Sequence, residues 1–248
     1  MSTTLFVRSY PADFEWLSYS VQSMKKYLTG YDKSILIIPN DSPHPKESSF
    51  FDEVILSDRP NIRGYIAQQL DKLECYKYID TEHVLFVDCD NIFNGPYDIN
   101  KLWFHEGLPT LYMTSYTALT PAPEDIAEQI ARTSGVKIDK HRYGLHWQDV
   151  VEKYMFIRPE YEYMRTIPLI HRTETIKECS QTYPHLIDKA HLIQDNDYSE
   201  FNFIGTFAHL NKHPYYFTDE IPPLPAKNFW SYGGITADIK TQIDMWLT

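Results

Sequence analysis

Hydrophobic residues in the first half of the chain form short continuous runs that alternate with longer stretches of helical periodicity. Continuous apolar runs are typical of strands buried on both faces of a parallel sheet, whereas apolar positions three or four residues apart indicate amphipathic helices. The predicted strands are Thr3–Ser9, Ser34–Ile38, Glu53–Ser57, His83–Asp88 and Thr110–Thr114, and the predicted helices are Asp13–Leu28 and Gly64–Ile79. This alternation predicts an α/β fold with a mostly parallel central sheet and helices on both faces.

The second half of the chain has a less regular pattern. We expect helices at Glu124–Ser134, over most of Tyr161–Ile193 with a break near Pro184, and at Ile235–Trp246, and strands at Tyr154–Ile157 and Tyr215–Phe217. No internal repeat, low-complexity tract or linker divides the sequence. We therefore expect a single domain over residues 1–248.

The composition suits one compact domain, because 43% of the 248 residues are hydrophobic. The net charge of −11 argues against a general binder of nucleic acids or of anionic membranes. The three cysteines have no metal-binding spacing and are odd in number, which favours a reduced compartment without structural disulfides. The sequence shows no signal-peptide pattern and no transmembrane segment, so we expect a soluble, cytoplasmic protein.

Two aspartates stand at the carboxyl end of the run His83–Asp88, in the sequence Asp88-Cys89-Asp90. In an extended chain, residues two positions apart point to the same side, so both carboxylates can face one cation while Cys89 points away. Mg²⁺ and Mn²⁺ prefer carboxylate oxygens and keep positions open for substrate phosphates. Because ligands of open α/β sheets bind outside the carboxyl ends of strands, we predict a metal and diphosphate site here. The alternative is a pair of turn carboxylates that cap the next segment, Asn91–Pro96.

Several segments of the chain resemble the nucleotide-sugar glycosyltransferases of the GT-A fold, in particular families that pair a Gln-Gln-x-x-Lys helix with a D-x-D motif. The segments are Phe6–Tyr10, Gln68–Leu73, Val84–Asp90 and Ser199–Phe201, and the resemblance is concentrated in the first 115 residues. It implies a Rossmann-like GT-A domain with a nucleotide-sugar and metal half at 1–115 and an acceptor half at 116–248. It also implies that Asp90 ligates Mn²⁺ or Mg²⁺, that Asp88 binds the ribose or the metal, and that the donor is a UDP or GDP sugar.

Four polar residues lie at or just after the ends of the first two predicted strands, where the resemblance places the base and ribose of the donor. Arg8 is near the end of the first strand, Tyr10 and Asp13 follow that strand, and Tyr10 could stack on a pyrimidine. Asp13 has the alternative of capping its helix, which is the commoner use of aspartate at such a position. Asp41 follows the second strand and is either a further contact to the base or a turn residue.

The helix that leads to the strand of the D-x-D motif carries two further candidates. Gln69 and Lys72 lie within one helical turn and can share a face, so Lys72 could reach a phosphate or the donor sugar. The alternative for Lys72 is an ordinary solvated lysine near Asp71 and Glu74.

Glu200 is the residue that we expect to act as the general base. An inverting transferase needs a carboxylate near the acceptor hydroxyl, in line with the leaving diphosphate. The alternative is structural, because Asp197-Tyr198-Ser199-Glu200 fits a capping box at the start of a helix. Asp149 is the next candidate for the base, followed by Asp197.

Two late histidines and three aromatic residues complete the set of candidates. The resemblance offers His209 or His213 as a further metal ligand, although a lone histidine is more often a hydrogen-bonded structural residue. Trp147, Trp230 and Tyr232 could form a platform for an acceptor sugar, with core packing as the default for each.

The pattern as a whole favours a metal-dependent glycosyltransferase that moves a sugar to a glycan or other hydroxyl acceptor, with inversion expected. One alternative is a nucleotidyltransferase that makes nucleotide sugars, which would carry a glycine-rich phosphate loop after the first strand. The chain has Tyr10-Pro11-Ala12 there instead. The other alternative is a non-catalytic carbohydrate-binding protein, which the paired carboxylates disfavour.

Overall fold

The structure of the chain is a computed structural model. The structure describes residues 1–59, 62–118, 143–164, 166–190, 193, 198–229, 231 and 234–248. The helix predicted at Glu124–Ser134 therefore lies outside the described residues.

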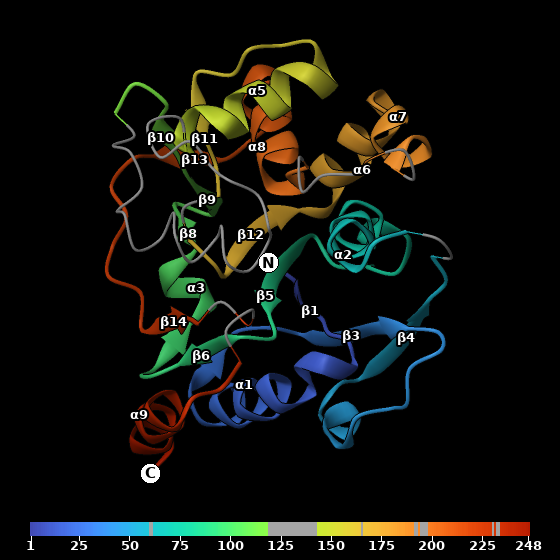
Figure 1. Cartoon of the computed structure of the whole chain (residues 1–248). Coiled ribbons are helices and arrows are strands. Elements are labelled where there is room, and N and C mark those ends of the chain that lie inside the picture. The colour runs from blue at the N-terminus through green and yellow to red at the C-terminus, as the bar shows by residue number, and fades with distance from the viewer. Residues whose placement is uncertain are drawn as a thin grey trace.

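A five-stranded sheet forms the centre of the molecule, in the strand order β12-β5-β1-β3-β4 (Figure 1). The strands are β1 (Thr3–Arg8), β3 (Lys33–Pro39), β4 (Glu53–Ser57), β5 (His83–Asp88) and β12 (Leu169–Arg172). The first four are parallel to one another, and β12 pairs with β5 in the antiparallel sense. The prediction of a mostly parallel sheet is thus confirmed.

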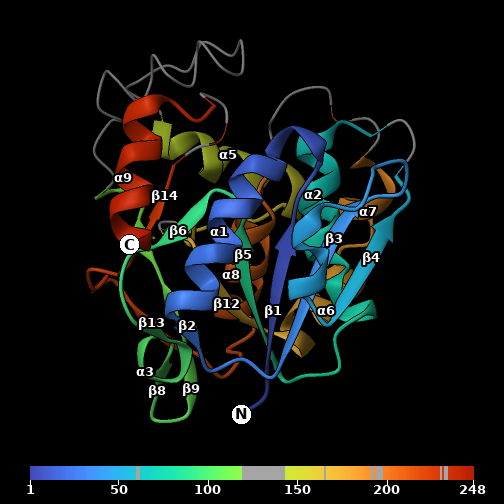
Figure 2. The ribbon, with the colours of Figure 1, turned by 90° about the horizontal axis from the view of Figure 1, so that it is seen from below.

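Helices cover both faces of this sheet (Figures 1 and 2). One face carries α1 (Phe14–Tyr27), against which α9 (Ala237–Leu247) packs. The other face carries α2 (Gly64–Leu73), α6 (Thr173–Thr182) and α8 (Glu200–Leu210), which contact one another. Both faces of the central strands are therefore buried, which explains why their sequences are continuously apolar.

Smaller elements surround the central layers. They are β2 (Leu28–Thr29), β6 (Asn91–Phe93), β7 (Tyr97–Asp98), β8 (Phe104–His105), β9 (Leu108–Tyr112), β10 (Thr114–Ser115), β11 (Tyr161–Glu162), β13 (Tyr216–Thr218), β14 (Ala226–Asn228), α3 (Ile99–Leu102), α5 (Tyr143–Met155), α7 (His185–Asp188) and the 3₁₀ helices η1 (Pro11–Asp13), η2 (Lys46–Phe50) and η3 (Cys75–Lys77). Among them, β14 pairs with β6 and so brings the C-terminal part of the chain beside the segment that follows β5.

The second half of the chain departs from the predictions at two places. The strand predicted at Tyr154–Ile157 is wrong, because Tyr154 and Met155 end helix α5 and pack one apolar side of it against the core. The prediction of helix over most of Tyr161–Ile193 is only partly correct, since β11 and β12 precede α6 and α7. Short apolar runs of this length fit either a strand or a helix, and their tertiary partners decide between the two.

Helix α8 is buried nearly all round, from Glu200 to Ala208. It packs against α2, α5, α6 and β11, so no face of these first turns is left for solvent. Gly205 allows the closest approach, because a Cβ atom there would lie 2.3 Å from the ring of Tyr163. The start of α8 is therefore fixed firmly within the core.

Candidate functional site

The carboxyl ends of β1 and β5 meet at the point where the strand order of the sheet reverses. The chain runs from β1 through α1 to β3 and β4, and returns through α2 to β5 on the other side of β1. Arg8 and Asp88, the last residues of β1 and β5, are direct partners in the register of these strands. A switch point of this kind is where open α/β sheets bind their ligands.

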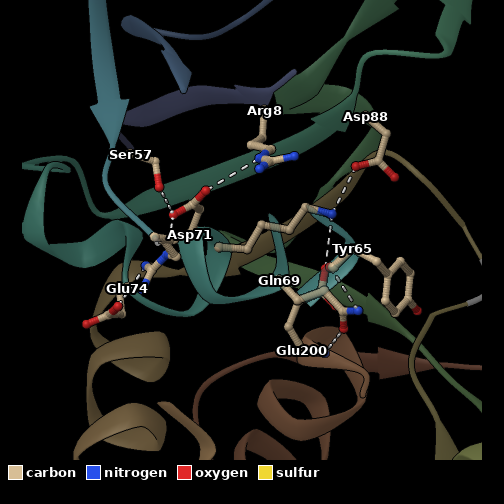
Figure 3. Close-up of polar contacts among 10 residues, drawn as sticks. Arg8, Ser57, Tyr65, Gln69, Asp71, Glu74, Asp88 and Glu200 are labelled. Carbon is tan, nitrogen blue, oxygen red and sulfur yellow. Dashed lines mark hydrogen bonds and ion pairs between the residues drawn. The ribbon is translucent and has the colours of Figure 1, made fainter. Parts of the chain in front are cut away.

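Lys72, Asp88 and Glu200 form a buried cluster at this point, here called the Lys72 cluster. The ammonium Nζ of Lys72 lies 2.9 Å from Oδ1 of Asp88 and 3.0 Å from Oε1 of Glu200. Figure 3 shows that Asp88 and Glu200 reach toward each other from β5 and α8. The Lys72 side chain is only 4% exposed, so the alternative of a solvated surface lysine is wrong.

The charges of the Lys72 cluster are set by burial and by mutual attraction. Burial lowers the pKa of Lys72, but Asp88 and Glu200 outweigh it and raise this pKa above its ordinary value, so Lys72 remains an ammonium. Burial raises the pKa of Glu200, and the neighbouring Lys72 opposes that rise. The Lys72 cluster thus contains one ammonium group, which stays charged, between two carboxyl groups.

Gln69 turns its side chain toward the start of α8. Its Oε1 accepts a hydrogen bond from the backbone N–H of Glu200 at 3.2 Å, and its Nε2 donates to the carbonyl of Tyr65 at 3.5 Å. Ser199 is the N-cap residue and Glu200 is the first residue of α8, which places Glu200 outside the third position that a capping box requires. The capping-box alternative is therefore wrong, and Asp197 lies outside the described residues.

Asp13 and Asp90, in the segments that follow β1 and β5, share a contact with Ser231. The backbone N–H of Ser231 donates to Oδ2 of Asp90 at 2.7 Å, and its hydroxyl donates to Oδ2 of Asp13 at 3.4 Å. The Cys89 thiol also donates to Oδ2 of Asp13 at 3.5 Å. Asp13 occupies the N-cap position of α1 but makes no side-chain hydrogen bond to the helix, so its carboxylate does not cap α1.

These carboxyl groups hold their protons more tightly than aspartate does in water. Burial, followed by the negative charge of Asp88, raises the pKa of Asp90 to about 7. Burial also raises the pKa of Asp13, against the hydrogen bonds that it accepts. A cation beside these two groups would favour their ionised forms.

Ser231 is a site residue that sequence reasoning missed. The pairing of β14 with β6 and a hydrogen bond from the N–H of Phe229 to the carbonyl of Asp90 lead the chain past the aspartates. Phe229 packs between Trp16 and Trp246, which anchors this passage to α1 and α9. A backbone donor of this kind leaves no signal in the sequence, whereas the neighbouring Trp230 and Tyr232, proposed for acceptor binding, lie outside the described residues.

Asp71 organises a second buried cluster next to the first, here called the Asp71 cluster. Asp71 accepts hydrogen bonds from Ser57 Oγ at 2.7 Å, from Arg59 Nε at 2.7 Å and from Arg8 Nε at 3.4 Å (Figure 3). Arg59 also pairs with Glu74 at 2.7 Å. Within the part of the chain that the structure describes, Nη1 of Arg8 is buried without a hydrogen-bond partner. Arg8 thus places at the end of β1 a guanidinium group whose Nη1 can still donate hydrogen bonds.

Two of the remaining donor-binding candidates lie at the rim of this site. Tyr10 is 36% exposed, and the guanidinium of Arg8 lies 5.9 Å from the centre of its ring. Asp41 is exposed in the turn that follows β3, at the carboxyl end of that strand. Tyr10 and Asp41 both lie at the edge of the sheet where the other candidate site residues are found.

The structure places His209 and Asp149 away from the Lys72 cluster. His209 lies nine positions after Glu200 on α8, which corresponds to about 14 Å along the helix axis. Its Nδ1 pairs with the hydroxyl of Tyr163 at 2.8 Å, so it does not join Asp88 and Asp90. Asp149 is exposed on α5 and pairs with Arg158 at 3.1 Å.

The other two late candidates have structural surroundings. His213 contacts the hydroxyl of Thr175 at 3.0 Å and the carboxylate of Glu178 at 3.4 Å. Trp147 is partly buried against the main core, in agreement with the default role of core packing.

The donor set at the carboxyl ends of the strands fits a divalent cation. Within the described residues, ion pairs join four carboxyl groups of this region to four cationic side chains, and two further carboxyl groups accept hydrogen bonds from Ser231. The ion pairs join Asp71, Glu74, Asp88 and Glu200 to Arg8, Arg59, Lys72 and Lys77, and the two further groups are Asp13 and Asp90. These two carboxyl groups stand outside the ion pairs, and Mg²⁺ and Mn²⁺ prefer oxygen ligands of this type.

The described residues do not enclose a metal ion by themselves. No three His, Cys, Asp or Glu side chains among them are grouped as a closed metal site. A site with one or two carboxylates suits a cation that also binds substrate phosphates, because Mg²⁺ is usually held by few protein ligands. Asp88 and Asp90 are the residues that would hold it.

Comparison with known proteins adds no family to this description. No protein-family model matches the sequence, and a search of curated proteins found no similar one. No helix among the described residues is both long enough and apolar enough to cross a membrane. The function is therefore inferred from the arrangement of the side chains.

Proposed function

We propose that the protein is a metal-dependent glycosyltransferase of the GT-A type. Its donor would be a nucleoside-diphosphate sugar of the UDP or GDP type, and its acceptor a hydroxyl group of a glycan or another molecule. The observation that carries this proposal is the position of Asp88 and Asp90 at the carboxyl end of β5, at the switch point of the sheet and beside Arg8. The carboxyl groups of Asp13 and Asp90, which contact Ser231 and stand outside the ion pairs of this region, support a divalent cation as part of the site.

Each residue of the site has a role in this proposal. Asp90 and Asp88 would hold Mn²⁺ or Mg²⁺, which as a Lewis acid would stabilise the charge that develops on the leaving diphosphate. Arg8 and Lys72 supply the positive side chains nearest to that charge. Tyr10 offers an exposed ring to the nucleobase at the end of β1.

Glu200 remains our candidate for the general base, and inversion the expected outcome. Its pKa is raised by burial, which brings its proton affinity closer to that of a base working near neutral pH. Asp149 is paired with Arg158 on α5, so it takes no part in the proposal.

The start of α1 argues against the nucleotidyltransferase alternative. After β1 the chain enters the 3₁₀ helix η1, whose first residue is Pro11, and then α1. A glycine-rich loop with several backbone N–H groups turned toward a phosphate would need a different conformation at this point.

Calorimetry with nucleoside diphosphates tests the proposal directly. UDP and GDP are titrated into the protein with Mn²⁺ and with EDTA, and we expect tight binding of one nucleotide only in Mn²⁺. Asp90→Asn should abolish the dependence on Mn²⁺, whereas Asp188→Asn, an exposed aspartate on α7, should leave it unchanged. Equal affinity in EDTA and in Mn²⁺ would contradict the metal-dependent proposal.

A second assay separates an enzyme from a binding protein. The protein is incubated with UDP and GDP sugars in Mn²⁺, and the release of free nucleoside diphosphate is measured with water or added sugars as acceptor. A transferase releases the nucleotide at a rate that depends on Asp90. A non-catalytic carbohydrate-binding protein would release none.

A further inference from the structure

We infer that Lys72 exchanges partners when the site binds its ligands, turning from Asp88 to a phosphate oxygen as Asp88 turns to the cation. This inference rests on the proposed function and specifies how its cation and its diphosphate are coupled. Binding of either one would strengthen binding of the other, because Lys72 competes with the first and attracts the second.

The contacts of Lys72 with α8 are built to persist. Glu200 is held at the start of α8 through its backbone N–H, which donates to Gln69. The ring of Phe201 lies 4.5 Å from Nζ of Lys72 and is itself buried against Phe86. These partners belong to the buried first turn of α8, so they keep the ammonium in place.

The contact with Asp88 is the one that can open. The side chain of Asp88 is 27% exposed, compared with 4% for Lys72 and 5% for Glu200, so solvent and ligands reach the cluster from the side of Asp88. The backbone of Asp88 is fixed by a hydrogen bond from its N–H to Oδ1 of Asn91 at 3.0 Å. A change of partner therefore requires only movements of side chains.

Electrostatics gives the exchange its direction. Lys72 at 2.9 Å from Asp88 competes with any other cation for that carboxylate. Once Asp88 serves a divalent cation, Lys72 keeps only Glu200 as a counter-ion, and its ammonium can donate to an additional anion. A diphosphate that binds the same cation would bring its oxygens to this position.

Replacement of Lys72 by methionine separates the exchange from a fixed structural ion pair. The affinity for Mn²⁺ alone is measured by titration calorimetry, and the affinities for pyrophosphate, UDP and GDP are measured in saturating Mn²⁺. Exchange predicts opposite changes in Lys72→Met: Mn²⁺ alone binds at least about threefold more tightly, and the diphosphates bind about tenfold to a hundredfold more weakly. Lys177→Met, which removes an exposed lysine paired with Glu174, is the matched control and should change neither.

A second variant guards against loss of folding. Lys72→Met leaves two carboxyl groups of the cluster without their cation, whereas Lys72→Met combined with Glu200→Gln removes one of these charges as well. We expect the double variant to stay folded, to bind Mn²⁺ alone more tightly than the wild type, and to gain less Mn²⁺ affinity than the wild type does when pyrophosphate is added.

The outcomes separate this inference from the proposed function. If the wild type binds UDP or GDP with Mn²⁺ while both variants bind Mn²⁺ alone no more tightly than the wild type, the exchange is wrong and the proposed function stands. If the opposite changes appear with pyrophosphate while no nucleotide binds, the exchange stands and the nucleotide-sugar donor is wrong. If the wild type binds neither Mn²⁺ nor pyrophosphate, both are wrong.

Discussion

Asp71 and Lys72 are neighbours on α2, and each is the centre of a buried ionic cluster with a different relation to solvent. In the Asp71 cluster, one carboxylate 3% exposed receives three donors from the ends of β1 and β4 and from the following loop. In the Lys72 cluster, one ammonium joins two carboxyl groups, of which Asp88 is accessible. The first cluster ties the sheet to α2, and the second presents charge where a ligand can arrive.

The comparison teaches that burial of a charged residue does not by itself identify a functional residue. Both clusters lie at the carboxyl ends of the parallel strands, and both are held by the same helix. They differ in whether one member of the ion pair can be replaced by a ligand without breaking the core. The exposure of one partner in a buried ion pair is therefore a better indication of a functional residue than burial is.

The largest effect is expected for Asp71→Ala. Loss of this carboxylate leaves the buried guanidinium of Arg8 and the largely buried guanidinium of Arg59 without their main acceptor, which should cost about 3–5 kcal/mol of unfolding free energy. Urea denaturation measures the change, with Glu53→Ala as the control because Glu53 forms an exposed pair with Lys33. A loss below about 1 kcal/mol, the level of a surface pair, would remove the distinction between this cluster and the surface.

A smaller loss is expected for Lys72→Ala. A lysine on an exposed helix face would be replaced at almost no cost, but Lys72 is buried, so we expect a loss of about 2–3 kcal/mol, below the usual cost of breaking a buried pair because Asp88 can turn to water. Urea denaturation of Lys72→Ala beside Lys177→Ala measures it. Equal stability of the two variants would show that the Lys72 cluster makes no structural contribution.

His171 on β12 is a buried titratable residue without a hydrogen-bond partner among the described residues, in contrast to the charged residues of both clusters. Burial lowers its pKa to about 3, and neither ring nitrogen has a hydrogen-bond partner among the described residues. As the pH falls below about 6.5, the unfolded chain binds a proton at His171, whereas the folded protein does not until the pH approaches 3. The contribution of His171 to the unfolding free energy is therefore fully present above pH 6.5 and is lost as the pH falls toward 3. We expect a loss of about 2 kcal/mol between pH 7.5 and pH 5 from this residue alone.

The measurement is urea denaturation at these two pH values for the wild type and for His171→Phe. The variant should lose the dependence that His171 causes, whereas His105→Phe, at an exposed histidine, should retain it. Identical pH dependence of the wild type and His171→Phe would show that His171 is not buried as a neutral group.

The smallest effect is expected for Gln69→Ala. The N–H of Glu200 would lose its acceptor at the buried start of α8, which should cost about 1–2 kcal/mol. Gln22→Ala, on the exposed side of α1, is the control and should change stability by less than about 0.5 kcal/mol. If Gln69→Ala instead left stability unchanged and weakened nucleotide binding, Gln69 would be a donor contact and not a support for α8.

The sequence predicts the parallel part of the sheet well, because each of its strands is an apolar run between clear turn signals. The predicted strand Glu53–Ser57 has the observed bounds, and His83–Asp88 does as well. It fails for Leu169–Arg172, which joins the sheet as an antiparallel edge strand. That segment is short and holds two polar residues, and only its pairing with β5 makes it a strand.

The site is predictable where it depends on strand ends, and hidden where it depends on long-range packing. Asp88 follows from the end of an apolar run, and its alignment with Arg8 follows from the parallel pairing. The burial of Lys72 requires α8 to pack against α2, which no local sequence pattern predicts. The contact of Ser231 with Asp90 uses a backbone N–H, which every residue except proline possesses.

The contact between Ser231 and Asp90 also has a consequence for the order of folding. It joins residues 141 positions apart, whereas the parallel strands of the sheet all come from the first 88 residues. Contacts that close long loops carry a larger entropic cost and tend to form late. We expect refolding to restore the sheet first and the surroundings of Asp90 last, so that far-ultraviolet circular dichroism recovers before the proposed Mn²⁺ binding does. A growing chain on the ribosome would by the same reasoning remain without its completed carboxylate site until β14 and α9 have emerged.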